Sequence, residues 1–310
     1  MAYAVLFPGQ GSQFVGMGAD VFDARPDLVG DRADEFAGFS LRSLCLQGPE
    51  EELTRTEHAQ PALFALSYAL WDELAQKVPP PAAAAGHSLG EYTGLAAAGV
   101  YSYDVALGVV AERGRAMAAA SDAEPSAMAA VIGSDVDTVE EICARRRAEG
   151  GRLWVANINA PGQVVVAGSI EDVGILERDG RELGLRRVVH LAVAGAFHSP
   201  YMQPAADRLA DVLSRFDPAP PRFPVYANVT GAPVAPGDVG RSLVDQLVSP
   251  VRFAATLEAM AAAGIDTFVH VGPGDVTAGL ARRTLREATV LTVSTLDDIG
   301  EAVDALGSMQ

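Results

Sequence analysis

The pentapeptide Gly-His-Ser-Leu-Gly at residues 86–90 constrains the fold of this chain more than any other feature. It follows a run of small residues at 82–85 and precedes a helix-like run at 91–98, so it lies where a strand would turn sharply into a helix. Flanking glycines allow that turn and leave Ser88 exposed at its apex. The new helix directs free N–H groups at the same point. The pattern predicts a nucleophilic serine beside an oxyanion site, and its structural alternative is a plain tight turn.

Composition excludes several classes of protein. The chain has 310 residues, 49% of them hydrophobic, and can bury the core of one large domain with or without a smaller one. Its formal net charge of −17 argues against nucleic acid or an anionic membrane as a partner. No apolar run reaches the length of a membrane span, and the start of the chain reads as a core strand instead of a signal peptide. Cys45 and Cys143 have no metal or disulfide spacing, which favours a reduced, cytoplasmic setting without a metal.

The middle of the chain has a distinct order of elements. Strand patterns at 127–132, 153–158, 163–167 and 187–193 alternate with helical patterns at 136–148 and 170–183. This β-α-β-β-α-β order is ferredoxin-like. We therefore expect an α/β protein in which a small ferredoxin-like subdomain, residues 126–193, is inserted into a large α/β-hydrolase-like domain, residues 1–125 and 194–310. The cleft between the two is the expected ligand site.

The large domain has its own element patterns. Residues 3–7 read as a buried strand that leads into a loop rich in glycine and amides at 8–13. A helix is expected at 61–76, and another from a cap at Asp104 to about residue 120. Strands are expected at 267–271 and 289–293.

A nucleophilic serine needs a base, and histidine is the usual one. His198 is the first candidate, because its loop follows the last strand of the small subdomain and so lies at the expected cleft. His87 adjoins Ser88, but neighbours on a tight turn point apart, so it is given a positioning role. No acidic residue has an obvious place as third member of a triad, and a carbonyl oxygen is left to orient the imidazole.

The other three histidines have structural interpretations. His190 and His270 lie within apolar strand patterns, which is typical of hydrogen-bonded core histidines. His58 reads as a residue of the surface or of a helix start.

Arg113 lies in a largely apolar helical run at 109–117. An arginine on such a helix often extends its charged end to solvent. If it faces the cleft instead, its planar fork suits a substrate carboxylate.

Motifs along nearly the whole chain resemble those of the malonyl-CoA:acyl carrier protein transacylases, including the discrete acyltransferases that serve polyketide synthases in trans. They are Phe-Pro-Gly-Gln-Gly-Ser-Gln at 7–13, Gly-His-Ser-Leu-Gly-Glu at 86–91, Arg113, Asn-Ile-Asn-Ala-Pro-Gly-Gln at 157–163, Gly-Ala-Phe-His-Ser-Pro at 195–200, Gln246 before Pro-Val-Arg-Phe at 250–253, and Val-Gly-Pro-Gly at 271–274.

The resemblance implies a ping-pong acyl transfer in which malonyl-CoA acylates Ser88 and the pantetheine thiol of an acyl carrier protein then takes the malonyl group. It implies no bound metal or redox cofactor, and we expect a monomer. The implied roles are His198 as general base and acid, the main-chain carbonyl of Gln246 as its orienting group, the backbone amides of Gln10 and Leu89 as the oxyanion hole, Arg113 as partner of the malonyl carboxylate, and His87 and Asn159 as pocket lining.

Phe197 bears on substrate choice. A bulky ring beside the base crowds a substituent on the α-carbon, and in the resembled family phenylalanine here accompanies malonyl over methylmalonyl. The alternative is that Phe197 is only part of the core. Whether the chain serves fatty acids or polyketides stays open, with residues 39–45 favouring a polyketide role.

Three other functions are alternatives for a chain with this serine turn. An acyl hydrolase that edits carrier proteins would use the same serine and histidine, but it has no need of Arg113. A transferase of uncharged acyl groups between carriers would lack that arginine. A docking module without activity is disfavoured by the intact Ser88, His198 and Gln10.

A carrier protein is usually acidic, as this chain is, so docking needs a local basic patch. The candidates are residues 145–147, residues 186–187, and residues 282–283 with Arg286, each of which has a solvated face as its alternative.

Overall fold

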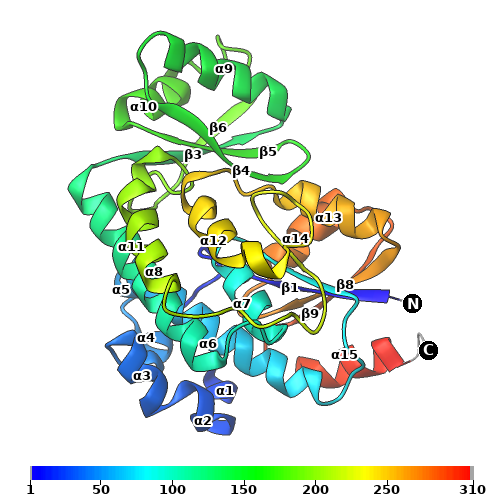
Figure 1. Ribbon diagram of the computed structural model, residues 1–310. Coiled ribbons are helices and arrows are strands. Elements are labelled where there is room, and N and C mark those ends of the chain that lie inside the picture. The colour runs from blue at the N-terminus through cyan, green and yellow to red at the C-terminus, as the bar shows by residue number, and fades with distance from the viewer. Residues whose placement is uncertain (1, 308–310) are drawn as a thin grey trace.

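A five-stranded parallel sheet forms the centre of the molecule in the computed structural model, which describes residues 2–307 (Figure 1). Its strands, in spatial order, are β7 (Val225–Tyr226), β2 (Ala83–Gly86), β1 (Ala2–Phe7), β8 (Ile265–Val271) and β9 (Thr289–Val293). All neighbouring pairs are parallel. Such strands are buried on both faces, which accounts for their nearly continuous apolar sequences.

Alternation along the strands assigns helices to the two faces of this sheet. Val5 and Phe7 of β1 share a core with α6 (Thr56–Ala75), α7 (Leu89–Ala97) and α8 (Tyr103–Ala123). Ala4 and Leu6 face the other way and pack with α13 (Phe253–Ala262) and α14 (Val276–Thr284). The remaining elements of this part are α1 (Ala19–Ala24), α2 (Pro26–Val29), α3 (Asp31–Ala37), α4 (Leu41–Gln47), α5 (Glu50–Thr54), α11 (Gln203–Leu213), α12 (Val239–Val248), α15 (Asp298–Gly307) and the 3-10 turns η1 (Pro200–Met202) and η2 (Pro236–Asp238).

A second, antiparallel sheet has the spatial order β4 (Leu153–Ala160), β5 (Gln163–Gly168), β3 (Ala127–Ile132) and β6 (Arg187–His190). Its helices are α9 (Val136–Ala148) and α10 (Ile170–Asp179), and Figure 1 shows them on the side away from the parallel sheet. The chain order is strand, helix, strand, strand, helix, strand, as the sequence predicted.

Strand β4 connects the second sheet to the rest of the molecule. The N–H of Ile158 donates to the carbonyl of Val251 at 2.8 Å, and the N–H of Val251 donates to the carbonyl of Ala156 at 2.9 Å. Val251 lies just before α13, so the two sheets are joined at this point by main-chain hydrogen bonds.

Several predicted boundaries were wrong. Helix α8 is capped by Ser102, whose Oγ accepts from the N–H of Val105, and Asp104 lies inside the first turn. Helix α6 begins at Thr56 and contains Pro61 in its second turn, where proline removes one helical hydrogen bond. The predicted helix and strand ends at 183 and 193 fall at Asp179 and His190.

Within the described part of the chain, the helices are all too short or too polar to cross a lipid bilayer.

Candidate active site

Ser88 lies at the turn between β2 and α7, with φ 51° and ψ −104°. Among the described residues, only Ser88 and His198 combine a side chain with a positive φ. Neighbouring glycines make the turn possible: a Cβ on Gly86 would lie 1.8 Å from the carbonyl carbon of Gly90, and one on Gly90 would lie 2.2 Å from the oxygen of Phe7. The predicted turn is thus confirmed, with the serine at its apex.

His198 is in hydrogen-bond contact with the serine, although 110 residues separate them. Its Nε2 lies 2.8 Å from Ser88 Oγ, and its Nδ1 lies 2.7 Å from the main-chain oxygen of Gln246. That oxygen belongs to the last turn of α12, where carbonyls have no helical donor. The pair therefore resembles a triad in which a carbonyl replaces the carboxylate.

The imidazole of His198 is buried, and its surroundings oppose protonation. Burial first, and then the positive charge of Arg113, lower the pKa of His198 to about 3. A neutral imidazole whose Nδ1 donates to a carbonyl has Nε2 free to accept a proton from the serine.

Arg113, on α8, is 1% exposed and does not reach solvent. Its Nη2 donates to Ser88 Oγ at 2.9 Å, and its Nη1 donates to Gln60 Oε1 at 2.7 Å. The guanidinium carbon also lies 5.2 Å from the centre of the Tyr92 ring. Within residues 2–307 no acidic residue forms an ion pair with it, and burial lowers its pKa. A buried cation with neutral partners is well suited to an incoming anion.

Three main-chain N–H groups of the serine turn already have acceptors. The N–H groups of Ser88, Gly90 and Glu91 donate to Asn228 Oδ1, the His87 oxygen and the Ser88 oxygen. Leu89 is the first residue of α7, where an N–H has no helical acceptor.

Gln10 follows β1 and lines the same cavity as Ser88. Its side chain is fixed, since Gln10 Oε1 accepts from Thr56 Oγ1 at 2.7 Å and Gln10 Nε2 donates to the Thr54 oxygen at 3.3 Å.

These residues surround a cavity of about 200 Å³. Phe197, Leu89 and Gln10 line it from the larger part of the molecule, while Asn159 of β4 lines it from the second sheet. His87 Nε2 lies 2.8 Å from Asn159 Oδ1, so one hydrogen bond joins the two sides. The structure thus brings together every predicted site residue, with the predicted cleft between them. No cluster of metal-binding side chains occurs in the described residues.

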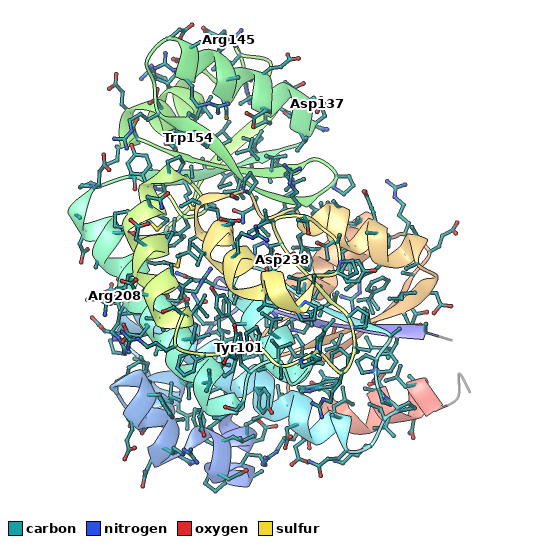
Figure 2. All side chains as sticks on the ribbon, viewed as in Figure 1. Tyr101, Asp137, Arg145, Trp154, Arg208 and Asp238 are labelled. Carbon is teal, nitrogen blue, oxygen red and sulfur yellow. The ribbon has the colours of Figure 1, made fainter. Side chains whose placement is uncertain are left out.

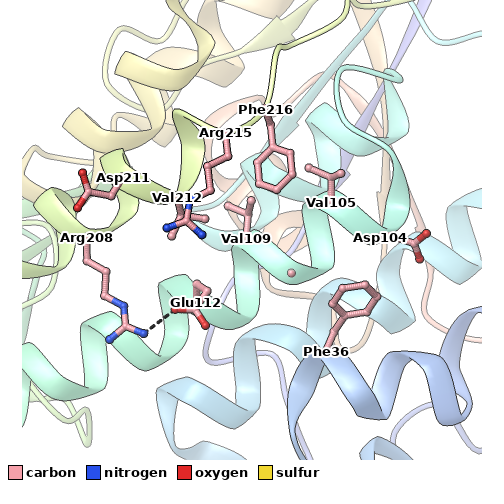
Figure 3. A pocket seen from close by; sticks show the side chains of 11 residues that line it. Phe36, Asp104, Val105, Val109, Glu112, Arg208, Asp211, Val212, Arg215 and Phe216 are labelled. Atoms are coloured by element: carbon pink, nitrogen blue, oxygen red, sulfur yellow. Dashed lines mark hydrogen bonds and ion pairs between the residues drawn. The ribbon is translucent and has the colours of Figure 1, made fainter.

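A larger cavity of about 530 Å³ lies elsewhere, between α3, α8 and α11 (Figure 3). Its lining is mainly apolar, from Phe36, Val109 and Phe216, and Arg208 pairs with Glu112 at its edge at 2.6 Å. It contains no serine, cysteine or histidine, so the cavity at Ser88 is the candidate active site despite its smaller volume.

Sequence reasoning missed the polar groups beneath the serine. Asn228 Oδ1 accepts from the Ser88 N–H at 2.7 Å, and Asn228 Nδ2 donates to the Gly86 oxygen at 2.7 Å, so this amide fixes the turn. Glu91 and Gln60 are buried in the same network. Of these three residues, only Glu91 could have been noticed in the sequence, because it directly follows the pentapeptide.

The other three histidines differ in burial and in their partners. His270 is buried and hydrogen-bonded to Thr277, which confirms its core assignment. The core assignment of His190 was wrong, because its side chain is 60% exposed and pairs with Glu177 at 2.8 Å at the edge of the second sheet. His58 lies in the first turn of α6, as expected.

A parallel-sheet fold with a serine at a strand-to-helix turn and a histidine in contact with it defines the class of serine-dependent acyl-transfer enzymes. The chain belongs to the acyl transferase domain family, whose model matches residues 5–309.

Comparisons within that family match more than nine-tenths of this chain. The chain is 39% identical to the malonyl CoA-acyl carrier protein transacylase of Bacillus subtilis (strain 168), over 98% of this chain and 96% of that protein. It is 40% identical to the polyketide biosynthesis protein ThaF of Burkholderia thailandensis, over 91% of this chain and 24% of that protein. A solved malonyl-transacylase in complex with its type II polyketide synthase acyl-carrier protein superposes with a TM-score of 0.92 at 36% identity, covering 98% of this chain and all of that one.

Proposed function

We propose that this chain transfers a malonyl group from malonyl-CoA to the pantetheine thiol of an acyl carrier protein. The observation that carries the proposal is Arg113, a buried cation in contact with Ser88 Oγ and, within the described residues, without an acidic partner. It suits an acyl group that ends in a carboxylate. The names of the Bacillus subtilis relative and of the solved carrier-protein complex support the same substrate and acceptor.

In the first half-reaction, His198 Nε2 takes the proton of Ser88 Oγ as that oxygen attacks the thioester carbonyl. The backbone N–H groups of Gln10 and Leu89 stabilise the resulting oxyanion. The bond from carbon to the sulfur of coenzyme A breaks, and the proton on Nε2 passes to that sulfur. Ser88 then carries the malonyl group as an ester.

In the second half-reaction the pantetheine thiol takes the place of the serine hydroxyl. His198 takes the thiol proton, the sulfur attacks the ester carbonyl, and the proton returns to Ser88 Oγ as the ester bond breaks. The main-chain oxygen of Gln246 accepts from Nδ1–H throughout and holds the ring in one tautomer. No step in this sequence needs a metal or a redox cofactor.

The walls of the cavity determine which acyl groups fit beside Ser88. Phe197 is buried beside His198, and its ring limits the room for a substituent on the α-carbon, which favours malonyl over methylmalonyl. His87 and Asn159 close the opposite side through their hydrogen bond. A narrow cavity also limits the water that would hydrolyse the ester.

Carrier docking is assigned to Arg186 and Arg187. Both are exposed, and β6 leads from Arg187 to residues 191–193, which line the cavity. In the 145–147 cluster, by contrast, Arg146 and Arg147 pair with Asp172 and Glu140. Figure 2 shows Arg145 at the outer end of α9, remote from the parallel sheet.

We also propose that the fold consists of two subdomains. The order β4-β5-β3-β6 supports a ferredoxin-like subdomain at 126–193, and the serine turn supports a hydrolase-like domain formed by 1–125 and 194–310. We also propose a cytoplasmic monomer, and the free thiols of Cys45 and Cys143 support the reducing compartment.

Incubation with labelled malonyl-CoA, with and without holo carrier protein, tests the proposal. Label is expected on Ser88 first and on the carrier after it is added. Release of free malonate in place of transfer would indicate an editing hydrolase, and failure of label to attach would indicate a docking module. Either result would contradict the proposed function.

A further inference from the structure

Two polar groups near Ser88 have no part in the mechanism above, namely the carboxyl of Glu91 and the side-chain amide of Gln246. Both side chains are buried, with 1% and 0% exposure. The amide of Gln246 lies between Glu91 and Arg113 and contacts each of them. A buried acid, amide and cation thus follow one another directly beside the nucleophile.

The hydrogen bonds fix the orientation of the amide. Gln246 Nε2 donates to Glu91 Oε2 at 2.7 Å and to the main-chain oxygen of Ser88 at 3.1 Å. Gln246 Oε1 accepts from Arg113 Nη2 at 2.9 Å. Because an amide donates only from its nitrogen and accepts only at its oxygen, the acid at one end forces the oxygen toward the guanidinium.

Glu91 is itself held in place. The N–H of Asn228 donates to the same Oε2 at 2.9 Å, and Asn228 Oδ1 accepts from the N–H of Ser88. This oxygen accepts from two N–H donors, which favours the ionised form, but burial raises the pKa of Glu91 to about 7, so the carboxylate predominates only above that pH. Above about pH 7, Glu91 therefore provides a negative charge close to Arg113, while the intervening amide of Gln246 prevents a direct ion pair.

We propose that Glu91 and the side chain of Gln246 are positioning residues that hold Arg113 charge-compensated but unpaired, and thereby set the preference for acyl groups with a free carboxylate over uncharged ones. The inference rests on the proposed function and goes further, because it assigns acyl selection to two side chains that touch neither the thioester nor the malonyl group. A direct pair would occupy the guanidinium, and loss of the amide would let it turn away.

We call the hydrogen-bonded series Glu91, Gln246 and Arg113 the relay. Two nearly isosteric substitutions test it, and they are expected to change the KM for malonyl-CoA in opposite directions. Gln246→Glu keeps the main-chain oxygen that holds His198 but places a carboxyl against Arg113. The two acids then share one proton, and the guanidinium draws the negative charge to position 246. We expect KM for malonyl-CoA to rise about tenfold or more, and by a larger factor than any change in acylation by acetyl-CoA, so that the preference for malonyl over acetyl falls.

Glu91→Gln keeps an oxygen that can accept from Asn228 and Gln246 but removes the charge. Arg113 then attracts a carboxylate more strongly, so KM for malonyl-CoA falls while acylation by acetyl-CoA is unchanged. Single-turnover acylation at pH 8, followed by intact-protein mass spectrometry, measures the concentration dependence of acylation by malonyl-CoA and by acetyl-CoA. Gln203→Glu, the same change at an exposed position on α11, is the matched control and leaves both acylations as they are.

The outcomes separate the two levels of inference. If the unmodified protein takes no malonyl group, the proposed function fails. If it does, and both variants lose malonyl and acetyl acylation in parallel, Glu91 and Gln246 are only structural and the relay is overturned. If Gln246→Glu does not fold, Glu91→Gln decides alone, and a malonyl KM that rises or stays constant overturns the proposal.

Discussion

The reactive residues are the ones whose backbones are least relaxed. Ser88 and His198 both have positive φ, a conformation that costs about 1–3 kcal/mol for a residue with a side chain. Asn228 holds the serine amide and Gln246 holds the imidazole, so neighbouring hydrogen bonds maintain these conformations. These strained backbone conformations place Ser88 Oγ and His198 Nε2 2.8 Å apart before any substrate binds.

Arg113→Ala tests the role of the guanidinium. Loss of a charge-assisted, bidentate contact of about 3 kcal/mol predicts a fall of about a hundredfold in kcat/KM for malonyl-CoA. Acetyl-CoA has no carboxylate to lose, so its acylation rate stays within a few-fold of the original. Steady-state and single-turnover kinetics with both substrates provide the measurement.

Arg208→Ala is the control for this prediction, because it removes an arginine from the other cavity (Figure 3). A parallel loss with both substrates in Arg113→Ala would contradict a carboxylate-binding role and indicate a structural one.

The dependence of kcat/KM on pH below neutrality tests the lowered pKa of His198. Because burial and Arg113 lower the pKa of His198 to about 3, we expect acylation to persist well below the ordinary histidine range. The same shift affects stability: the contribution of the neutral ring is complete above about pH 6.5 and is lost as the pH falls toward 3.

Two measurements check this prediction, namely kcat/KM against pH and the unfolding free energy of wild type and His198→Gln against pH. An acid limb of kcat/KM near pH 6.5, or unfolding free energies of the two proteins that depend on pH identically between about 3 and 6.5, would contradict it.

Sequence reasoning found the residues with local signatures and missed those without. Ser88 follows from its glycines, and His198 from its position after the small subdomain. Asn228 lies 140 residues from the serine that it holds, and no periodicity encodes such a contact. His190 was misassigned because its strand is at the edge of the sheet, where an apolar pattern does not imply burial.

At the scale of elements, the turn from β2 into α7 depends on close packing of backbone. Gly90→Ala would place a methyl group 2.2 Å from the main-chain oxygen of Phe7. Phe7 belongs to the rigid strand β1, so its oxygen cannot move away to make room. We expect a loss of about 2–4 kcal/mol in unfolding free energy, together with loss of the acyl-enzyme. Urea unfolding and intact-mass analysis measure the two effects.

Gly279→Ala, on the exposed face of α14, is the matched control for that substitution. Nothing lies within 4 Å of its added carbon, so it should gain about 0.5–1 kcal/mol. Equal stability of the two variants would contradict the packing argument.

The types of the elements were predictable, and their ends were not. The β-α-β-β-α-β order was recognisable because each segment has a clear period. Helix α8 is capped by Ser102 instead of Asp104 because two residues of similar capping strength lie close together, and only the tertiary structure selects one. Pro61 in α6 looked like a helix start for the same local reason.

At the scale of the whole molecule, the second sheet forms one wall of the cavity and presents its arginines to the surroundings. Charge reversal of Arg187 to Glu is expected to raise KM for the carrier protein about fivefold or more, with KM for malonyl-CoA unchanged. The same reversal at Arg145, at the outer end of α9, should leave both constants unchanged (Figure 2). Equal effects of the two reversals would argue for long-range charge instead of a docking site.

The central claim is that Ser88 carries the acyl group, and intact-protein mass spectrometry after mixing with malonyl-CoA tests it most directly. The account predicts one malonyl adduct, mapped to Ser88 by peptide sequencing, lost in Ser88→Ala and removed when holo carrier protein is added. An adduct that persists in Ser88→Ala, or transfer to the carrier without any acyl-enzyme, would contradict it.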